Sequence, residues 1–307
     1  MTQSIIERVD QLRQADDATR LAFLREKHFI AHPRMLALED RLHEIVQAPQ
    51  PYELNVAVFA RSFNGKSTLT KHFASLYPID PNPLGDAARA KVVRVSMPGE
   101  ASPREFAIRI LRFVGEPFNL KWTTSHLTSM MYAVLQSLGT KLLIIDEFQD
   151  IGNGTHRNRE ALKNIIKSIG EDCGCGVALF GTPPGVKIVN EEPQLQRRFE
   201  QLTLDPWEVD DDTRLLLRNL EILLPLRKAS NIVADPKLVE TICTNGDKVI
   251  GHIRRVVLDA ARTAIQTGRE VIDSKTLKAA GWVPLSVREK TVLEQLGPLE
   301  KEELELA

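Results

Sequence analysis

Hydrophobic residues recur along this chain in two patterns that alternate with each other. Short apolar runs, typical of strands buried in a parallel sheet, occupy residues 56–59, 91–97, 141–147, 177–182 and 199–204. Between these runs, apolar residues recur at three- and four-residue spacing, as at Leu127, Met131 and Leu135, which is typical of amphipathic helices. We therefore expect an α/β domain whose parallel sheet is flanked by helices and binds its ligand at the carboxyl ends of the strands.

The strand pattern stops near Trp207, and only helical patterns follow it. Apolar residues at helical spacing over 213–224, 236–243, 252–266 and 274–280 predict a small all-helical lid. Residues 1–50 are also helical in pattern, and Pro33 suits the first turn of a second helix there. The expected organisation is an N-terminal helical segment (1–50), an α/β core (51–206), a helical lid (207–282) and a charged C-terminal tail (283–307) that is mobile or serves for docking.

The composition is that of an ordinary globular protein. The chain has 307 residues, of which 43% are hydrophobic and 26% charged, and no apolar run approaches the roughly 18 residues that a membrane span needs. The N-terminal residues are polar and charged, unlike a secretory signal, and the three cysteines form neither a metal-ligand nor a disulfide pattern. We expect a cytoplasmic protein that has no membrane partner.

The first apolar run leads into a segment with the residues of a phosphate-binding loop. Residues 60–67 read Ala-Arg-Ser-Phe-Asn-Gly-Lys-Ser and precede a helical pattern, so backbone N–H groups and the positive end of a helix can surround a phosphate chain. Gly65 allows close approach of the backbone, Lys66 suits the β- and γ-phosphates, and the Ser67 hydroxyl suits Mg²⁺. The usual pattern begins with glycine, whereas Ala60 stands there in this chain. The residues expected to contact the nucleotide are Ser62, Phe63, Asn64, Gly65, Lys66, Ser67 and Thr68.

Two carboxylates end the third apolar run, where a parallel strand presents its ligand-binding residues. Asp146 is placed to hold the water shell of Mg²⁺ opposite Ser67, and Glu147 to polarise the water that attacks the γ-phosphate. Thr182 ends the fourth run and offers a polar group that could sense the same phosphate. These stretches predict that the protein binds ATP with Mg²⁺ and hydrolyses it.

Residues 87–123 are the best candidate for a surface that faces phosphates. They include seven lysines or arginines and three acids, a net charge of +4, in a chain whose overall charge is −1. Because the whole chain is nearly neutral, contact with nucleic acid must come from such a local patch. A solvated helix face has the same composition, so both interpretations stay open.

Together these stretches resemble the motifs of AAA+ ATPases. The resemblance covers about residues 20–285 and includes the phosphate loop, LLIIDE (142–147), Gly-Thr (181–182), Arg-Phe (198–199) and Gly-His-Ile-Arg-Arg (251–255). Within that superfamily, His-Pro-Arg at 32–34, LLIIDEFQDI, VALFGTP and QLQRRF are similar to the TniB/TnsC transposition ATPases. The implied fold is a P-loop AAA+ core with a parallel sheet, plus the helical lid.

The resemblance also implies a function and partners. Such ATPases hydrolyse ATP at subunit interfaces, assemble with copies of themselves on double-stranded DNA as a ring or a helical filament, and recruit or activate a transposase; a target-selection protein as a further partner stays open. Thr182 matches sensor 1, and Arg254 matches the sensor 2 arginine of the lid. Arg198 matches the arginine finger, with Arg197 as the alternative. The positions that match contacts to the DNA backbone are Arg104, Lys121 and Thr123.

Other functions stay open at this point. A replication initiator or helicase loader of the AAA+ class would share every ATPase motif but should carry an added DNA-binding domain, for which residues 283–307 are too few. A nucleotide-dependent signalling or scaffold switch would use the same site and never bind DNA. A small-molecule kinase is disfavoured, because Glu147 beside Asp146 favours attack by water.

Overall fold

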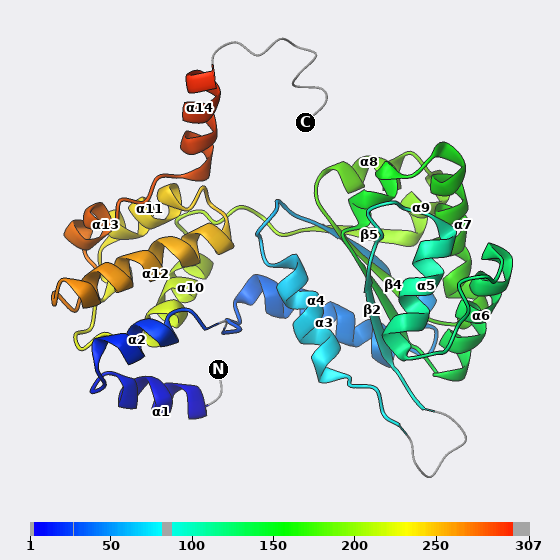
Figure 1. Ribbon diagram of the computed structural model, residues 1–307, viewed down its shortest axis with the longest axis horizontal. Helices are drawn as coiled ribbons and strands as arrows, with labels where there is room; N and C mark the ends of the chain where they lie inside the picture. Colours follow the sequence, from blue (N-terminus) through cyan, green and yellow to red (C-terminus); the bar gives the residue numbers. More distant parts are fainter. Residues whose placement is uncertain (1–2, 27, 82–87, 297–307) are drawn as a thin grey trace. The chain divides into compact units, whose positions relative to one another are not determined.

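Figure 1 shows the computed structural model, which describes residues 3–26, 28–81 and 88–296. The chain forms two compact units: an α/β unit of Pro33–Asp205, and a helical unit of Met1–His32 with Pro206–Ala307. The expected N-terminal segment of residues 1–50 is therefore divided between them at His32. The reason is packing, because Leu24 and Ile30 are buried in the core of the helical unit whereas the helix from Pro33 packs on the sheet.

The α/β unit is built on five parallel strands in the order β2-β3-β4-β1-β5. Every residue of β1, β3 and β4 is buried, whereas β2 and β5 at the edges are partly exposed. Strands covered on both faces need continuous apolar runs, which is why the sequence showed runs rather than alternation. All five predicted strands are confirmed: β1 Asn55–Phe59, β2 Val92–Ser96, β3 Leu142–Asp146, β4 Gly176–Gly181 and β5 Phe199–Thr203.

Helices cover both faces of this sheet. Figure 1 shows α5, α6 and α7 on one side and α3 and α4 on the other. The residues Ser102-Pro103-Arg104-Glu105 are a sequence signal for a helix start, and α5 begins there: the Ser102 hydroxyl accepts the N–H of Glu105 at 3.3 Å, and Pro103 is the first helical residue. The helices of the unit are α3 Pro33–Gln47, α4 Lys66–Leu76, α5 Pro103–Val114, α6 Thr124–Ser137, α7 His156–Cys173, α8 Pro184–Asn190 and α9 Pro193–Arg198, with short 3₁₀ turns η1 Pro51–Glu53 and η2 Phe148–Asn153.

The helical unit contains the four helices predicted for the lid and two from the N-terminal residues. Its elements are α1 Gln3–Leu12, α2 Asp17–Phe23, α10 Asp211–Ile222, the 3₁₀ turn η3 Ile232–Ala234, α11 Pro236–Asn245, α12 Ile250–Gln266, α13 Ser274–Ala280 and α14 Leu285–Leu296. The helix α14 covers the first part of the predicted tail, and residues 297–307 lie outside the described residues.

A buried ion pair joins α2 to the loop between α12 and α13 within this unit. The guanidinium of Arg20, which is fully buried, donates to both carboxylate oxygens of Glu270 at 2.8 and 2.7 Å, and to the carbonyl of Pro225 at 3.2 Å. These bonds hold the pKa of the Glu270 carboxyl below its ordinary value. Because an unpaired buried charge is costly, the pair fixes where α2 packs.

In the described part of the chain, none of the helices combines the length and apolar character required to span a bilayer.

Candidate functional site

The predicted site residues of the α/β unit meet at the carboxyl edge of its sheet. Strand β4 lies between β1 and β3, so Thr182, just beyond β4, lies between the loop that follows β1 and the carboxylates that end β3. The register agrees, because Phe59 at the end of β1 is paired with Gly181 at the end of β4. This edge is where parallel α/β sheets bind ligands.

The loop after β1 is shaped for an anion. Gly65 takes a left-handed conformation, with φ +90°, immediately before α4, and Phe63 does so too at +60°. Gly65, the residue before α4, has no side chain that could cap the helix. Since the first N–H groups of a helix have no partner within it, they can donate to a phosphate together with the positive end of the helix dipole. Ser67 is half-buried, whereas Ser62, Phe63 and Thr68 are exposed.

Lys66 is directed into this loop. Its side chain is buried, and its ammonium donates to the carbonyls of Ala60 at 2.7 Å and Arg61 at 3.0 Å. Burial lowers the pKa of Lys66, while the carboxylates of Glu147 and Asp146 oppose that shift. A buried ammonium that is held by neutral carbonyls alone can gain energy from an anion, which is what a phosphate chain in the loop would supply.

Asn64 has a structural role in the same loop. Its buried side-chain amide donates to the carbonyl of Leu204 at 3.0 Å, just beyond β5. The sequence assigned Asn64 to the nucleotide, and that contact stays a prediction, because its backbone N–H donates to the Arg61 carbonyl at 3.3 Å. The amide itself ties the loop to the neighbouring edge strand.

Asp146 lies at the centre of a buried polar network. One carboxylate oxygen accepts the N–H of Glu147 at 3.0 Å, and the other accepts the Arg94 guanidinium at 2.6 Å. Thr70 on α4 joins them, because its hydroxyl receives a bond from Arg94 at 2.9 Å and lies 3.3 Å from Asp146. Arg94 extends from β2, so the network connects β2, β3 and α4.

The oxygen donors here suit Mg²⁺, with Arg94 as a competitor. The Ser67 hydroxyl and the Asp146 carboxylate are hard oxygen ligands of the kind that Mg²⁺ prefers. Among the described residues, no group of three or more His, Cys, Asp or Glu is placed to hold a metal ion, so a bound Mg²⁺ would also need phosphate oxygens. The guanidinium of Arg94 already neutralises Asp146, which the sequence did not predict.

Glu147 follows Asp146 with a left-handed backbone, φ +54°. Its carboxylate accepts the side-chain amide of Gln149 at 2.8 Å. The carbonyl oxygen of that amide accepts the N–H of Thr182 at 3.0 Å. The structure therefore brings Glu147 and Thr182 together through Gln149, which sequence reasoning did not single out.

The other predicted arginines belong to other elements of the chain. Arg198 donates to the carbonyl of Lys167 at 2.8 Å and pairs with Glu171, both on α7. Arg197 is exposed and makes no hydrogen bond or ion pair with another described residue. Arg254 belongs to the helical unit, where it is half-buried and donates to the carbonyl of Glu26 at 3.1 Å. Burial lowers the pKa of Arg254.

The residues assigned to DNA gather around the loop between α5 and α6. Arg104 donates to the carbonyls of Trp122, at 2.6 Å, and Leu120, so part of its guanidinium holds this loop. Lys121 is exposed, and the hydroxyl of Thr123 accepts the N–H of His126 at the start of α6.

The basic segment 87–123 presents less charge at the surface than its composition suggests. Arg94 is committed to Asp146, and Arg109 donates to the carbonyls of Ser96 and Met97 at 3.1 and 3.3 Å. The position of Arg94 inside the apolar run Val-Val-Arg-Val was a sequence signal that its side chain pairs with a buried anion. Gln149 gave no comparable signal.

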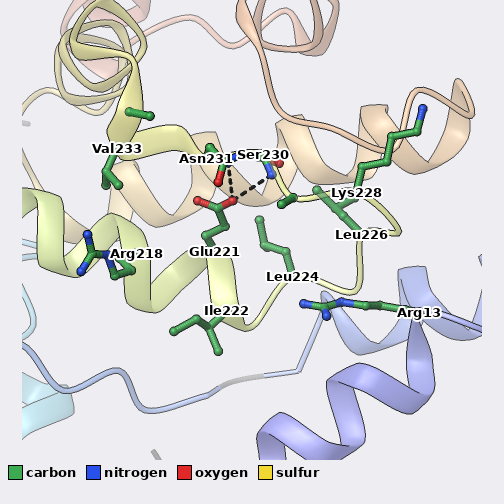
Figure 2. A pocket seen from close by; sticks show the side chains of 12 residues that line it. Arg13, Arg218, Glu221, Ile222, Leu224, Leu226, Lys228, Ser230, Asn231 and Val233 are labelled. Carbon is green, nitrogen blue, oxygen red and sulfur yellow. Dashed lines mark hydrogen bonds between the residues drawn. The ribbon is translucent and has the colours of Figure 1, made fainter.

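A separate pocket of about 340 Å³ lies in the helical unit (Figure 2). Arg13, Arg218 and Lys228 are among its lining residues, and none of the sequence-predicted site residues lines it. The carboxylate of Glu221 in this pocket accepts the backbone N–H groups of Ser230 and Asn231 at 2.9 and 2.6 Å. That acid therefore holds a turn of the chain, and the pocket offers no catalytic constellation.

Comparison with protein families gives one match. The model described as "TniB: Bacterial TniB protein" matches residues 20–209. A comparison with curated protein sequences found no match.

Several solved structures have the same fold. The ORC2 protein of Aeropyrum pernix, in ADPNP-ADP complexes, is 16% identical with a TM-score of 0.59, covering 84% of this chain and 70% of that one. Cdc6p of Pyrobaculum aerophilum is 14% identical with a TM-score of 0.60, covering 88% and 72%. Domain III of the Thermotoga maritima replication initiation protein DnaA is 13% identical with a TM-score of 0.52, covering 83% and 95%. At these identities the likeness shows the fold, which is that of AAA+ P-loop ATPases.

The Asp146–Arg94 ion pair leads to a testable prediction about the Mg²⁺ concentration that nucleotide binding requires. Replacing Arg94 by Met keeps most of the side-chain length and removes the charge beside Asp146. The Mg²⁺ concentration for half-maximal binding of a fluorescent ATP analogue should fall by about three- to tenfold, because the carboxylate then attracts the metal without competition. The melting temperature of the free protein should also fall, since a buried carboxylate loses its counter-ion.

Arg112→Met is the matched control, because Arg112 is exposed on α5 and lies over the ring of Phe118 with no carboxylate partner. An unchanged or higher Mg²⁺ requirement in the Arg94 variant, with the control like the parent, would show that Arg94 does not compete for Asp146.

Proposed function

The chain belongs to the TniB family, and from this premise we propose that it is an ATP-dependent DNA transposition protein. In this proposal it binds and hydrolyses ATP, assembles with copies of itself on double-stranded DNA, and recruits or activates a transposase. The observation that carries the proposal is the convergence of the phosphate loop, Lys66, Asp146 and Glu147 at one edge of the sheet. A target-selection protein is a further partner that the family resemblance suggests.

The proposed chemistry assigns a role to each group at this edge. The loop and the N-terminus of α4 bind the phosphates, and Lys66 exchanges its two carbonyl partners for the β- and γ-phosphates. Ser67 and the Asp146 carboxylate would hold Mg²⁺, which would neutralise charge on the phosphate oxygens. Glu147 orients and polarises the attacking water, and Thr182 contacts the γ-phosphate.

Two substitutions separate binding from hydrolysis. Lys66→Ala should abolish binding of an ATP analogue, because it removes the charge that faces the phosphates. Glu147→Gln should leave binding intact and lower the rate of ATP hydrolysis by about a hundredfold or more, since an amide cannot act as a base toward water. Calorimetry measures the binding, and phosphate release measures the rate. Lys71→Ala, exposed on α4, is the control and should behave like the parent. Normal hydrolysis by the Glu147 variant would refute its assigned role.

We further propose that Arg198 completes the site of a neighbouring subunit as an arginine finger. Its guanidinium is oriented by α7, through the Lys167 carbonyl and Glu171, so it is preorganised rather than free. A donated guanidinium stabilises the charge that develops on the γ-phosphoryl oxygens. Arg197 is the alternative, exposed and without such support. Arg254, a half-buried cation that donates to a neutral carbonyl, fits the sensor 2 role in the lid.

Mixing inactive variants tests whether the finger acts between subunits. Lys66→Ala protein retains the finger, and Arg198→Ala protein retains a complete phosphate loop. Each alone should be inactive, and a mixture should recover part of the hydrolysis, because mixed interfaces contain one intact site. The same mixture with Arg197→Ala identifies which arginine is used. If assembly is confirmed by light scattering and no mixing ratio restores hydrolysis with either arginine variant, the shared site does not exist.

We propose that DNA is held at its backbone by the loop between α5 and α6. Lys121 is exposed there, and Arg104 keeps N–H groups beyond the two that reach the loop carbonyls. Phosphate contacts of this kind carry no base information and release counterions. The alternatives are an AAA+ replication initiator or helicase loader, and a nucleotide-dependent switch that never binds DNA. If the protein is such a switch, no salt-dependent binding to DNA will be measured.

Substituting Lys121 by Ala should weaken binding equally for all DNA sequences. The plot of log affinity against log salt should lose about one unit of slope per lost contact, because fewer counterions are released. Arg104→Ala should add to this effect. Fluorescence anisotropy with two unrelated duplexes, in the presence of an ATP analogue, measures both quantities. Lys187→Ala on α8 is the control with an exposed lysine. DNA binding like that of the parent at every salt concentration would place the DNA surface elsewhere.

A further inference from the structure

One side chain connects the proposed catalytic glutamate to the end of the neighbouring strand. The amide nitrogen of Gln149 donates to Glu147 Oε2 at 2.8 Å, and the amide oxygen accepts the backbone N–H of Thr182 at 3.0 Å. Because a backbone N–H can only donate, it fixes which end of the amide faces it. The NH₂ end must therefore face the carboxylate, so the direction of both bonds is determined.

The surroundings hold Gln149 in this position. It belongs to η2, whose first residue, Phe148, is fully buried. A Cβ on Gly181 would come within 3.1 Å of the Gln149 amide oxygen, so the amide would have to shift by a few tenths of an ångström to make room for a side chain there. Among the described residues, Gln149 is the only side chain that is hydrogen-bonded to the Glu147 carboxylate.

We propose that Gln149 is a positioning residue that orients the Glu147 carboxylate and couples it to the end of β4. The terminal torsion of a glutamate is broad, so a carboxylate without such a bond samples many orientations. With Oε2 held by the amide, Oε1 is left to accept a hydrogen bond from the attacking water. When contact with the γ-phosphate shifts the Thr182 backbone, the side-chain amide of Gln149 transmits that shift to the Glu147 carboxylate. This inference rests on the proposed ATPase activity.

Gln149→Leu tests the proposal because leucine has a similar size and makes neither bond. The variant should bind an ATP analogue like the parent, with KM within about twofold, and its kcat should fall by about tenfold or more, as misplacement of a catalytic group produces. A kcat within twofold of the parent would overturn the proposal. Gly181→Ala provides a second route, since its methyl group would come within 3.1 Å of the Gln149 oxygen and shift it by a few tenths of an ångström, while Gln149 itself is unchanged. Gly152→Ala is the control, because its Cβ would meet only Ile188 Cδ1 at 3.7 Å, an ordinary contact.

The double variant distinguishes positioning from a general structural role. If Gln149 acts through Glu147, adding Gln149→Leu to Glu147→Gln should slow hydrolysis no further. A further tenfold loss in that background would overturn the proposal, because the effect would then be independent of Glu147. Should the Gln149→Leu variant not fold, Gly181→Ala is introduced into the parent and into the Glu147→Gln variant instead. Comparison of the two rates then shows whether the effect depends on Glu147. Absence of hydrolysis by the parent protein would instead refute the proposed function, so the two failures are distinguishable.

Discussion

The site depends on one buried carboxylate. Asp146 is almost completely inaccessible to solvent at the end of the inner strand β3, and a buried anion is costly unless it is paired and hydrogen-bonded. Arg94 from β2, the hydroxyl of Thr70 from α4 and the N–H of Glu147 meet this requirement. The same contacts fix the start of α4, the end of β3 and the direction in which Glu147 leaves the strand. The carboxylate thereby organises both the fold at this edge and the chemistry proposed for it.

Much of the architecture could be predicted from local patterns. The apolar runs located all five strands, and Ser102, Pro103 and Glu105 marked the start of α5. The strand order could not be predicted, because β1 pairs with β4 and β5, which are distant in sequence, and local patterns contain no information about such pairing. The division of residues 1–50 at His32 could not be predicted for a similar reason, since the buried Arg20–Glu270 pair joins positions 250 residues apart.

The motifs of the candidate site could be predicted from the sequence, but not all of the contacts between its residues. Lys66, Asp146, Glu147 and Thr182 lie at one edge as expected, although their individual roles stay predictions. Arg94 was counted toward a basic surface because a tally of charges does not show that a side chain points inward to a carboxylate. Gln149 had no sequence signal at all, since an amide acquires a role only when its two partners are known in space. Polar networks of this kind are properties of the folded chain rather than of any motif.

The most direct test of the central claim is a structure of the protein with Mg²⁺ and a non-hydrolysable ATP analogue. We expect phosphates over the N-terminus of α4, with the Lys66 ammonium moved from the carbonyls of Ala60 and Arg61 to the β- and γ-phosphates. We also expect Glu147 within hydrogen-bonding distance of a water in line with the γ-phosphate. A nucleotide bound at another place, with Lys66 still on its two carbonyls, would contradict the account.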